Sequence, residues 1–309
     1  MPEPTLAYFR GDFRPFEESK VSIRSKALNY GLGCFEGIRA YWNPEQEQLF
    51  VFRAHEHYTR MHQSCDILHL PFKESVEDLA AVTTELLRRN NHREDTYIRP
   101  IFFNSSETLS PLFTMEDNEL AIYTLPLRDY LDVDKGVTAC VSSWRRVSDN
   151  MIPARAKPTA AYLNSALARF EARSNGYDEA IFLTQEGAVS EGSAEHLFLV
   201  RNGVLVTPSS QEDNLDGITR RTLVELARAE LGFTVEERRV SRTELYVAEE
   251  AFFCGTGAQM SPLVAVDHRQ VGDGECGPMT RKLMDLYFRV VRGEEPKYAH
   301  WCTPVYEKA

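Results

Sequence analysis

IPARAKPTAAYLNSALARFEARSNGYDEAIFLTQEGAVSEGSAEHLF, residues 152–198, contains a single lysine, Lys157. Pro158 follows it, and because a residue before proline favours extended geometry, we expect Lys157 at the end of a strand. Apolar residues then repeat at helical spacing over residues 163–170, and Asn175-Gly176 supplies a stop signal. The stretch therefore predicts an extended lysine followed by a helix.

Two further side chains of this stretch can join the lysine. Tyr162 is expected on the first turn of the helix, and Glu191 follows a predicted strand at 180–183 and a turn at 185–187. A lysine, a tyrosine and a glutamate together suit a pyridoxal phosphate Schiff base, in which an acid pairs with the protonated pyridine nitrogen. Each residue alone is more often an ordinary surface or core-edge residue, and only the ordered set favours the cofactor.

Four long motifs extend this pattern over almost the whole chain. They are NYGLGCFEGIRAY (29–41), AKPTAAYLNSALARFEARSNGYDEAIFL (156–183), GAVSEGSAEHLFLVRNGVLVTP (187–208) and GECGPMTRKL (274–283). In this order they resemble the branched-chain amino-acid aminotransferases, a fold-type IV group of pyridoxal phosphate enzymes. The resemblance implies an α+β fold of two domains with the active site between them.

The resemblance also implies roles for individual residues. Lys157 would be the catalytic, Schiff-base lysine, Tyr162 the partner of the ring oxygen and Glu191 the partner of the pyridinium nitrogen. The other implied cofactor contacts, most of them to the phosphate, are Arg60, Leu215, Ile218, Thr219 and Thr256. The implied substrate pocket contains Tyr30, Phe35, Gly37, Arg39, Tyr97, Arg99, Tyr130, Thr256 and Gly257.

Composition limits the classes of function that the chain can have. A net charge of −11 over 309 residues, with no basic run, opposes nucleic-acid binding. No run of eighteen apolar residues and no signal-peptide pattern is present, so we expect neither a membrane span nor secretion. The six cysteines are scattered without metal-ligand spacing, which indicates reduced thiols in a cytoplasmic protein.

Two motifs of the N-terminal half invite other interpretations. The glycine-rich run 29–37 lacks the lysine and serine of a phosphate-binding P-loop, and its spacing is not that of a dinucleotide fingerprint. His55, His57 and His62 suggest a metal, but no nearby carboxylate or cysteine completes a site, so we predict none. Arg60 in the same segment is usually a solvated residue by its position, although arginine binds phosphate well.

The strand TYIRP (96–100) carries a candidate carboxylate receptor. Tyr97 and Arg99 point to one face because side chains alternate along a strand. A tyrosine hydroxyl beside a guanidinium can bind a carboxylate, yet spacing alone fits a surface pair equally well. For the second carboxylate of glutamate or 2-oxoglutarate, Arg99 is the candidate, with Arg39 as an alternative or helper.

The segment 104–115, NSSETLSPLFTM, departs from the family pattern. The branched-chain enzymes usually carry a glycine-rich loop here that covers the pocket of the neighbouring subunit, whereas this segment has no glycine. We therefore expect a stiffer and more polar loop. This departure affects the predicted substrate range more than the predicted chemistry.

The whole sequence predicts a small α/β domain (1–128), a linker (129–136) and a large cofactor-binding domain (137–309). The expected reaction is reversible ping-pong transfer of the amino group of leucine, isoleucine or valine to 2-oxoglutarate by a homodimer or higher homo-oligomer. The alternatives are a D-amino-acid or (R)-amine transaminase of the same fold, and an aminodeoxychorismate lyase. A non-catalytic pyridoxal phosphate carrier is disfavoured because Lys157, Tyr162 and Glu191 are all present.

Overall fold

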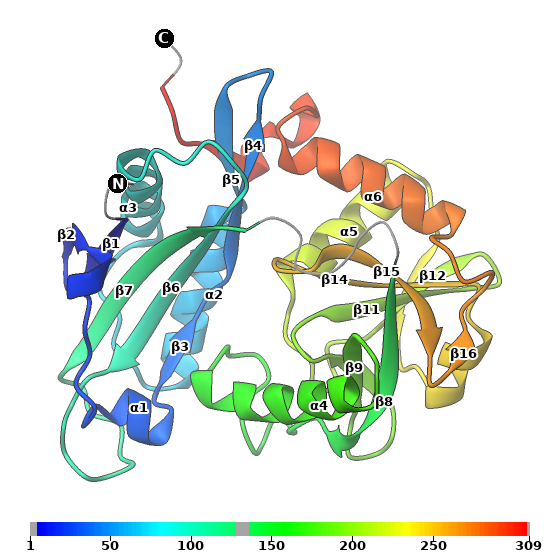
Figure 1. Ribbon diagram of the computed structural model, residues 1–309, viewed down its shortest axis with the longest axis horizontal. Coiled ribbons are helices and arrows are strands. Elements are labelled where there is room, and N and C mark those ends of the chain that lie inside the picture. The colour runs from blue at the N-terminus through cyan, green and yellow to red at the C-terminus, as the bar shows by residue number, and fades with distance from the viewer. Residues whose placement is uncertain (1–4, 128–135, 308–309) are drawn as a thin grey trace. The chain divides into compact units, whose positions relative to one another are not determined.

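The computed structural model describes residues 5–127 and 136–307. These residues form two compact units (Figure 1). The first unit takes its described residues from 1–128, 156–160 and 289–309, and the second from 129–155 and 161–288. The predicted linker 129–136, apart from Gly136, and the predicted pocket residue Tyr130 lie outside the described residues.

The first unit is built on an antiparallel sheet in the order β17-β5-β4-β6-β7-β1-β2, with β3 paired to β6. Its C-terminal strand β17 pairs with β5, so chain segments far apart in sequence share this sheet. Its strands are β1 (Leu6–Phe9), β2 (Asp12–Pro15), β3 (Gly33–Phe35), β4 (Ile38–Asn43), β5 (Gln48–Phe52), β6 (Thr96–Asn104), β7 (Asn118–Pro126) and β17 (Cys302–Pro304).

Two long helices, α2 (Ala54–Ile67) and α3 (Val76–Arg89), complete the core of the first unit. Ser75 caps α3 by accepting from the Asp78 N–H, and acidic residues follow in the first turn, as the helix dipole favours. The spacing of Tyr58, Met61, Cys65 and Leu68 predicts a buried helical stripe. Tyr58, Met61 and Cys65 are buried in α2, whereas Leu68 lies at its C-cap and is half-buried. The short helices of this unit are α1 (Lys26–Tyr30), η1 (Phe16–Glu18) and η4 (Pro296–Trp301).

The second unit contains a mixed sheet in the order β10-β9-β8-β15-β14-β11-β12-β13, with β16 paired to β15. Its strands are β8 (Val137–Arg145), β9 (Glu179–Leu183), β10 (Val189–Gly192), β11 (His196–Arg201), β12 (Val204–Pro208), β13 (Val235–Arg238), β14 (Glu250–Gly255), β15 (Gln259–Val266) and β16 (Arg269–Gln270). Its helices are α4 (Tyr162–Ser174), α5 (Ile218–Ala229), η3 (Arg242–Val247) and most of α6 (Pro278–Val291), and η2 (Thr159–Ala161) lies at the boundary between the units. Both units combine helices with a sheet, and the predicted α+β class is confirmed.

Helix α4 confirms the predicted helix but buries a different face. Small residues, Ala168 and Ala172, pack against β8 and β9 in a cluster with Phe182. Leu163 and Phe170, part of the apolar repeat that predicted the helix, are 69% and 75% exposed. Small side chains allow the helix to approach the sheet closely, so the large apolar residues turn outward.

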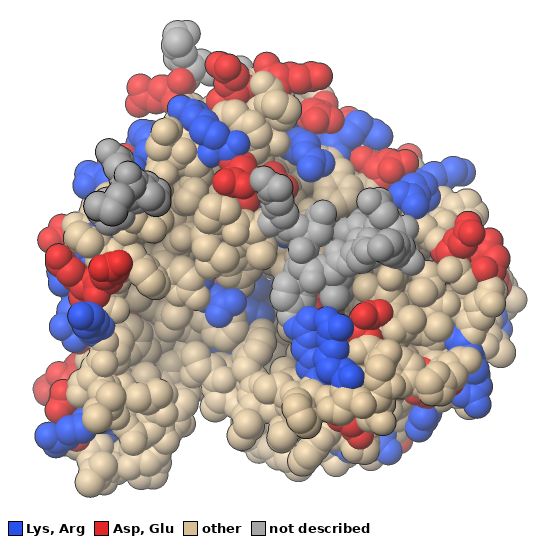
Figure 2. Space-filling view, in the orientation of Figure 1, with Lys and Arg blue, Asp and Glu red and all other residues tan. Residues whose placement is uncertain are grey.

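On the face seen in Figure 2, acidic and basic side chains are interspersed. Among the described residues, no helix has both the length and the apolar character needed to cross a membrane.

Candidate active site

Lys157 lies in a segment of the first unit that is anchored by its backbone. The Lys157 N–H donates to Ser64 Oγ (3.1 Å), and its carbonyl accepts from the Phe35 N–H (3.2 Å). Pro158 forms an isolated bridge with Cys34. The expectation of a strand end is wrong, because β8 ends at Arg145 and residues 156–158 lie along β3 and α2 instead. Lys157 is therefore half-buried, and its main chain is fixed by two hydrogen bonds.

A buried charged cluster lies on the same side of helix α2. Glu36 is fully buried and accepts from Arg60 Nε and Nη2, both at 2.7 Å, and from His57 Nδ1 at 2.8 Å. Burial alone would raise the pKa of Glu36, but the charge of Arg60 and the hydrogen bonds of His57 and Arg60 outweigh it and lower that pKa. Glu36 therefore stays ionised and fixes the guanidinium plane of Arg60.

The same environment holds His57 neutral. Burial lowers the pKa of His57, the charges of Arg60 and Lys157 lower it further, and Glu36 only partly opposes them. His57 therefore contributes a hydrogen bond to Glu36 rather than a charge. This contact gives the buried His57 ring a polar partner.

The candidate carboxylate receptor of β6 is formed as the alternation predicted. Arg99 Nη2 donates to Tyr97 Oη at 2.8 Å, and Arg99 Nε is buried without a hydrogen-bond partner among the described residues. A Cβ built on Gly37 would overlap the Tyr97 hydroxyl, so only glycine leaves room for it. An unpaired buried donor is costly unless a ligand satisfies it, and a carboxylate fits the need.

The other predicted pocket residues of the first unit take different positions. Phe35 is buried, with the Arg99 Cζ 4.2 Å and the Lys157 Nζ 5.3 Å from its ring centroid. Tyr30 ends α1 and is 37% exposed. Arg39 is 1% exposed; its Nη2 donates to the Leu127 carbonyl at 2.6 Å and lies 4.0 Å from Asp95. Phe35 is therefore the predicted pocket residue that brings the lysine and the receptor arginine to one ring.

In the second unit Glu191 is held among polar partners. Its carboxylate pairs with Arg146 Nη2 at 2.9 Å, accepts from the Leu215 N–H at 3.3 Å and lies 3.8 Å from His196 Nδ1. The β9–β10 pairing shifts by one residue between Val189 and Gly192, and such a bulge redirects the side chains within it. Glu191 is 6% exposed, so an oriented carboxylate is available inside this unit.

The predicted phosphate seat is the start of helix α5. The helix begins after Gly217 with no side-chain cap, and Ile218 and Thr219 are buried at its first turn. A Cβ on Gly217 would overlap the His196 ring, so glycine is required there. Uncapped N–H groups and the positive end of the helix dipole favour a phosphate.

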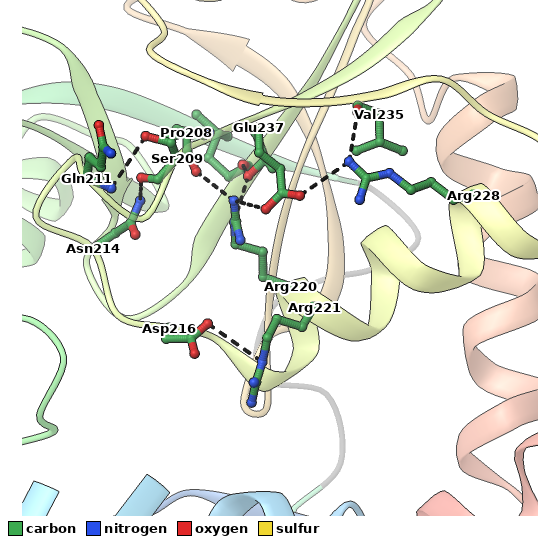
Figure 3. A network of polar contacts seen from close by, with 12 residues as sticks. Pro208, Ser209, Gln211, Asn214, Asp216, Arg220, Arg221, Arg228, Val235 and Glu237 are labelled. Atoms are coloured by element: carbon green, nitrogen blue, oxygen red, sulfur yellow. Dashed lines mark hydrogen bonds and ion pairs between the residues drawn. The ribbon is translucent and has the colours of Figure 1, made fainter. Parts of the chain in front are cut away.

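Arg220 fixes this helix start to the sheet (Figure 3). It is 4% exposed, and its Nη2 donates to the Pro208 carbonyl and to Glu237 Oε2, both at 3.0 Å. These contacts join α5 to β12 and β13. The first turn of α5 therefore has a defined position within the unit.

The remaining predicted residues of the second unit are Tyr162, Thr256 and Gly257. Tyr162 is half-buried at the first position of α4. Thr256 and Gly257 form the turn between β14 and β15 and are partly exposed. A turn of this kind presents backbone N–H groups to a ligand.

Sequence reasoning missed four polar residues of these clusters: Glu36, His57 as a partner of Glu36, Arg146 and His196. Glu36 directly precedes Gly37 in the motif NYGLGCFEGIRAY. Its place in this motif could have marked it as a candidate site residue. Arg146 and His196 had no local signal, because strand pairing and a bulge bring them to Glu191.

Comparison with known proteins agrees with this architecture. Residues 33–266 match the family described as amino-transferase class IV. The chain is 47% identical, over 98% of its length and 97% of the relative, to a probable branched-chain-amino-acid aminotransferase of Aquifex aeolicus (strain VF5). The chain therefore belongs to the class IV aminotransferase family.

Two solved structures of branched-chain aminotransferases are also similar to this chain. One is the branched-chain aminotransferase of Thermoproteus uzoniensis with norvaline, at 44% identity and a TM-score of 0.94, covering 98% of this chain and 99% of that one. The other is the branched-chain amino acid aminotransferase of Thermobaculum terrenum in its PLP-form. It is 38% identical, with a TM-score of 0.92, and 99% of this chain and 100% of that chain are covered.

Proposed function

We propose that this protein is a pyridoxal phosphate-dependent branched-chain-amino-acid transaminase with 2-oxoglutarate as amino acceptor. The observation that carries the proposal is the arrangement around Phe35, where the amine of Lys157 and the guanidinium of Arg99 lie by one ring. An amine that can form and release a covalent bond and a cation that can bind a carboxylate are the two groups that transamination of glutamate needs. The relatives named for branched-chain substrates support the same activity.

The residues present fit the cofactor. The uncapped start of α5, with the glycine required at Gly217 and with Thr219 in its first turn, suits the cofactor phosphate. Arg60 of the first unit carries a group that also suits a phosphate. Glu191 suits the protonated ring nitrogen, because it is a carboxylate whose orientation is fixed by its contact with Arg146. When bound, pyridoxal phosphate supplies an electron sink for the charge that develops at the substrate Cα.

Lys157 supplies the proton transfer of the proposed reaction. Its main chain is anchored by Ser64 and Phe35, and its side chain is half-buried, so the amine can approach and leave the substrate Cα. The Lys157 amine would take the proton from the substrate Cα as a general base and deliver it, as a general acid, to the cofactor carbon, so that the amino group stays on the cofactor. Alternation between donor and acceptor substrates gives ping-pong kinetics.

One pocket has to accept both the apolar side chain of a branched-chain amino acid and the carboxylate side chain of glutamate. Such a pocket needs apolar walls and one cation. Phe35 and Tyr30 supply apolar surface for leucine, isoleucine or valine, and Arg99 binds the second carboxylate of glutamate or 2-oxoglutarate. The buried Nε of Arg99, which has no partner among the described residues, supports this assignment. The turn at Thr256 and Gly257 is proposed to bind the α-carboxylate common to all these substrates.

We also propose a homodimer, or a higher homo-oligomer, built through the 105–115 segment. Lys26 holds this segment, because its N–H donates to the Ser106 carbonyl and its Nζ to the Leu112 carbonyl at 2.7 Å. The segment, α1 and the residues just before α1 leave large apolar side chains uncovered: Ile23 (81% exposed), Leu28 (67%), Leu109 (83%), Leu112 (68%) and Met115 (74%). A second copy would cover them. Sedimentation of the purified protein that gives only a monomer would contradict this assembly.

The cysteines support a cytoplasmic location. All six are free, and five of them are buried. A reducing compartment keeps such thiols unpaired.

The decisive experiment is an amino-transfer assay with the purified, cofactor-loaded protein. L-leucine with 2-oxoglutarate should give glutamate, and no oxo acid should accumulate beyond one turnover without the acceptor. Turnover of (R)-1-phenylethylamine or D-alanine in place of L-leucine would favour the other transaminases of this fold. Continuous release of pyruvate from aminodeoxychorismate without an acceptor would identify a lyase.

A further inference from the structure

We propose that Phe35 is a positioning residue whose ring holds the Arg99 guanidinium and the Lys157 amine, and thereby sets the preference for dicarboxylate over monocarboxylate ligands. This inference rests on the proposed function, in which Arg99 binds the second carboxylate. It gives Phe35 a task beyond that of an apolar pocket wall, since the ring acts through two cations.

The ring of Phe35 contacts the guanidinium of Arg99. The Arg99 Cζ lies 4.2 Å from the centroid of Phe35 and 5.1 Å from that of Tyr97, both within the range of cation–π attraction. The hydrogen bond from Nη2 to Tyr97 Oη adds a directional contact. Two rings and one hydroxyl thus hold the guanidinium by contacts that bring no negative charge to it. The positive charge is therefore kept for a ligand.

Phe35 also contacts Lys157. Its Nζ lies 5.3 Å from the Phe35 centroid, and the Phe35 N–H donates to the Lys157 carbonyl. Backbone and ring of one residue therefore contact the lysine. Phe35 itself is fixed, because β3 pairs with β6 with Phe35 opposite Ile101.

The selectivity depends on the uncharged aromatic neighbour of Arg99. A carboxylate that replaced the ring as the neighbour of Arg99 would neutralise the guanidinium and oppose an incoming anion. An aromatic face stabilises the cation without adding a negative charge. A ring is therefore suited to a site that must stay cationic for 2-oxoglutarate and yet apolar for leucine.

The test compares Phe35→Leu, which removes the aromatic face, with Phe35→Tyr, which keeps it. Binding of glutarate and of 4-methylpentanoate to the cofactor-loaded protein is measured by calorimetry. We expect Phe35→Leu to weaken glutarate binding by about 3- to 30-fold and 4-methylpentanoate binding by less than about 2-fold. Phe35→Tyr should retain glutarate affinity within about 2-fold.

Equal losses for both ligands in Phe35→Leu, or an equal loss of glutarate binding in Phe35→Tyr, would overturn the proposal. Tyr97→Phe serves if Phe35→Leu does not fold: it keeps both rings and removes one hydrogen bond, and it should lose glutarate affinity selectively. An unselective Tyr97→Phe would also overturn the positioning of Arg99. Wild-type protein that does not transaminate L-leucine would instead refute the proposed function, whatever the Phe35 variants do.

Discussion

The two units differ in the charged side chains that they bury. Among its described residues the first unit buries more cations than carboxylates: Lys26, Arg39, Arg53 and Arg60 are buried with one carboxylate, Glu36, which pairs with Arg60. The second unit encloses carboxylates: Glu191 and Glu195 are 6% and 3% exposed, and Glu191 is compensated by Arg146.

The difference is what the proposed function would require. A phosphate or a substrate carboxylate needs cations and hydrogen-bond donors, which the arginines and the lysine of the first unit would supply. A protonated ring nitrogen needs a carboxylate, and Glu191 of the second unit is the proposed partner. Burial makes each charge costly, so the compensating partners are as informative as the charges themselves.

The largest expected effect is that of Lys157→Ala. Loss of both the covalent and the proton-transfer role should lower kcat by at least about 10⁴-fold, measured with L-leucine and 2-oxoglutarate. Lys73→Ala, an exposed lysine of the same unit, is the control and should retain wild-type kcat. Borohydride treatment followed by peptide mapping should find the pyridoxyl group on Lys157, and another labelled lysine would refute the assignment.

Glu36→Gln tests whether the carboxylate of the first unit is structural. Removing one partner of a buried ion pair leaves Arg60 uncompensated, so the free energy of unfolding should fall by about 3–5 kcal/mol. Glu56→Gln breaks the partly exposed pair with Arg53 and should cost less than about 1 kcal/mol. Urea unfolding that shows equal losses in the two variants would mean that the Glu36 cluster adds no more than a surface pair.

Arg99→Ala tests dual substrate recognition. A charged hydrogen-bonded contact of about 1.5–3 kcal/mol implies a roughly 10- to 200-fold loss in the 2-oxoglutarate half-reaction, with a much smaller loss for leucine. Single-turnover kinetics followed through the cofactor spectrum measure both half-reactions. Arg93→Ala, at an exposed arginine, is the control. Equal losses for the two substrates would assign Arg99 to the common α-carboxylate or to the shape of the site.

Glu191→Gln tests the acid of the second unit. Removing the negative charge beside the ring nitrogen should lower kcat at least about 10-fold. Glu186→Gln, at an exposed position on the preceding turn, should leave kcat unchanged. Wild-type kcat in Glu191→Gln would place this residue outside the site.

Glu195→Gln should have the smallest effect. It should raise the free energy of unfolding, whereas Glu36→Gln should lower it. Burial and the charge of Glu179 raise the pKa of Glu195 from 4.5 to about 8, so the folded protein keeps a proton that the unfolded chain releases at lower pH. The resulting stability is present below pH 4.5 and is lost as the pH rises towards 8.

Glutamine at position 195 has no carboxyl proton to lose, so the substitution removes this pH dependence of the stability. At about pH 8 Glu195→Gln should be more stable than wild type by about 1 kcal/mol or more, a few degrees in Tm, with little gain at about pH 5. Thermal melts at both pH values, with Glu186→Gln as a control, measure the difference. A gain that does not grow between the lower and the higher pH would show that Glu195 is not held protonated.

The sequence predicted most elements well. Apolar spacing predicts an amphipathic helix over 74–91, turn residues predict hairpins over 6–16 and 41–52, and Ser241 with Glu244 predicts a capping box. The structure confirms these local patterns as α3, the β1–β2 and β4–β5 pairs and the cap of η3. The alternation along β6 likewise predicted that Tyr97 and Arg99 share a face, and they are hydrogen-bonded. Where local pattern and packing diverged, as on α4, the helix was right and its buried face was not.

By itself, the sequence determined the family and the α+β class and made Lys157 the candidate for the reactive lysine, because long motifs in the family's order carry all three. Only the tertiary structure decided that residues 156–160 lie along β3 and α2 and that β17 joins the sheet of the first unit. It also decided which partners compensate each buried charge, as Glu36 does for Arg60 and Arg146 for Glu191. Such contacts join residues many positions apart, and periodicity carries information only about neighbours within a turn or a strand.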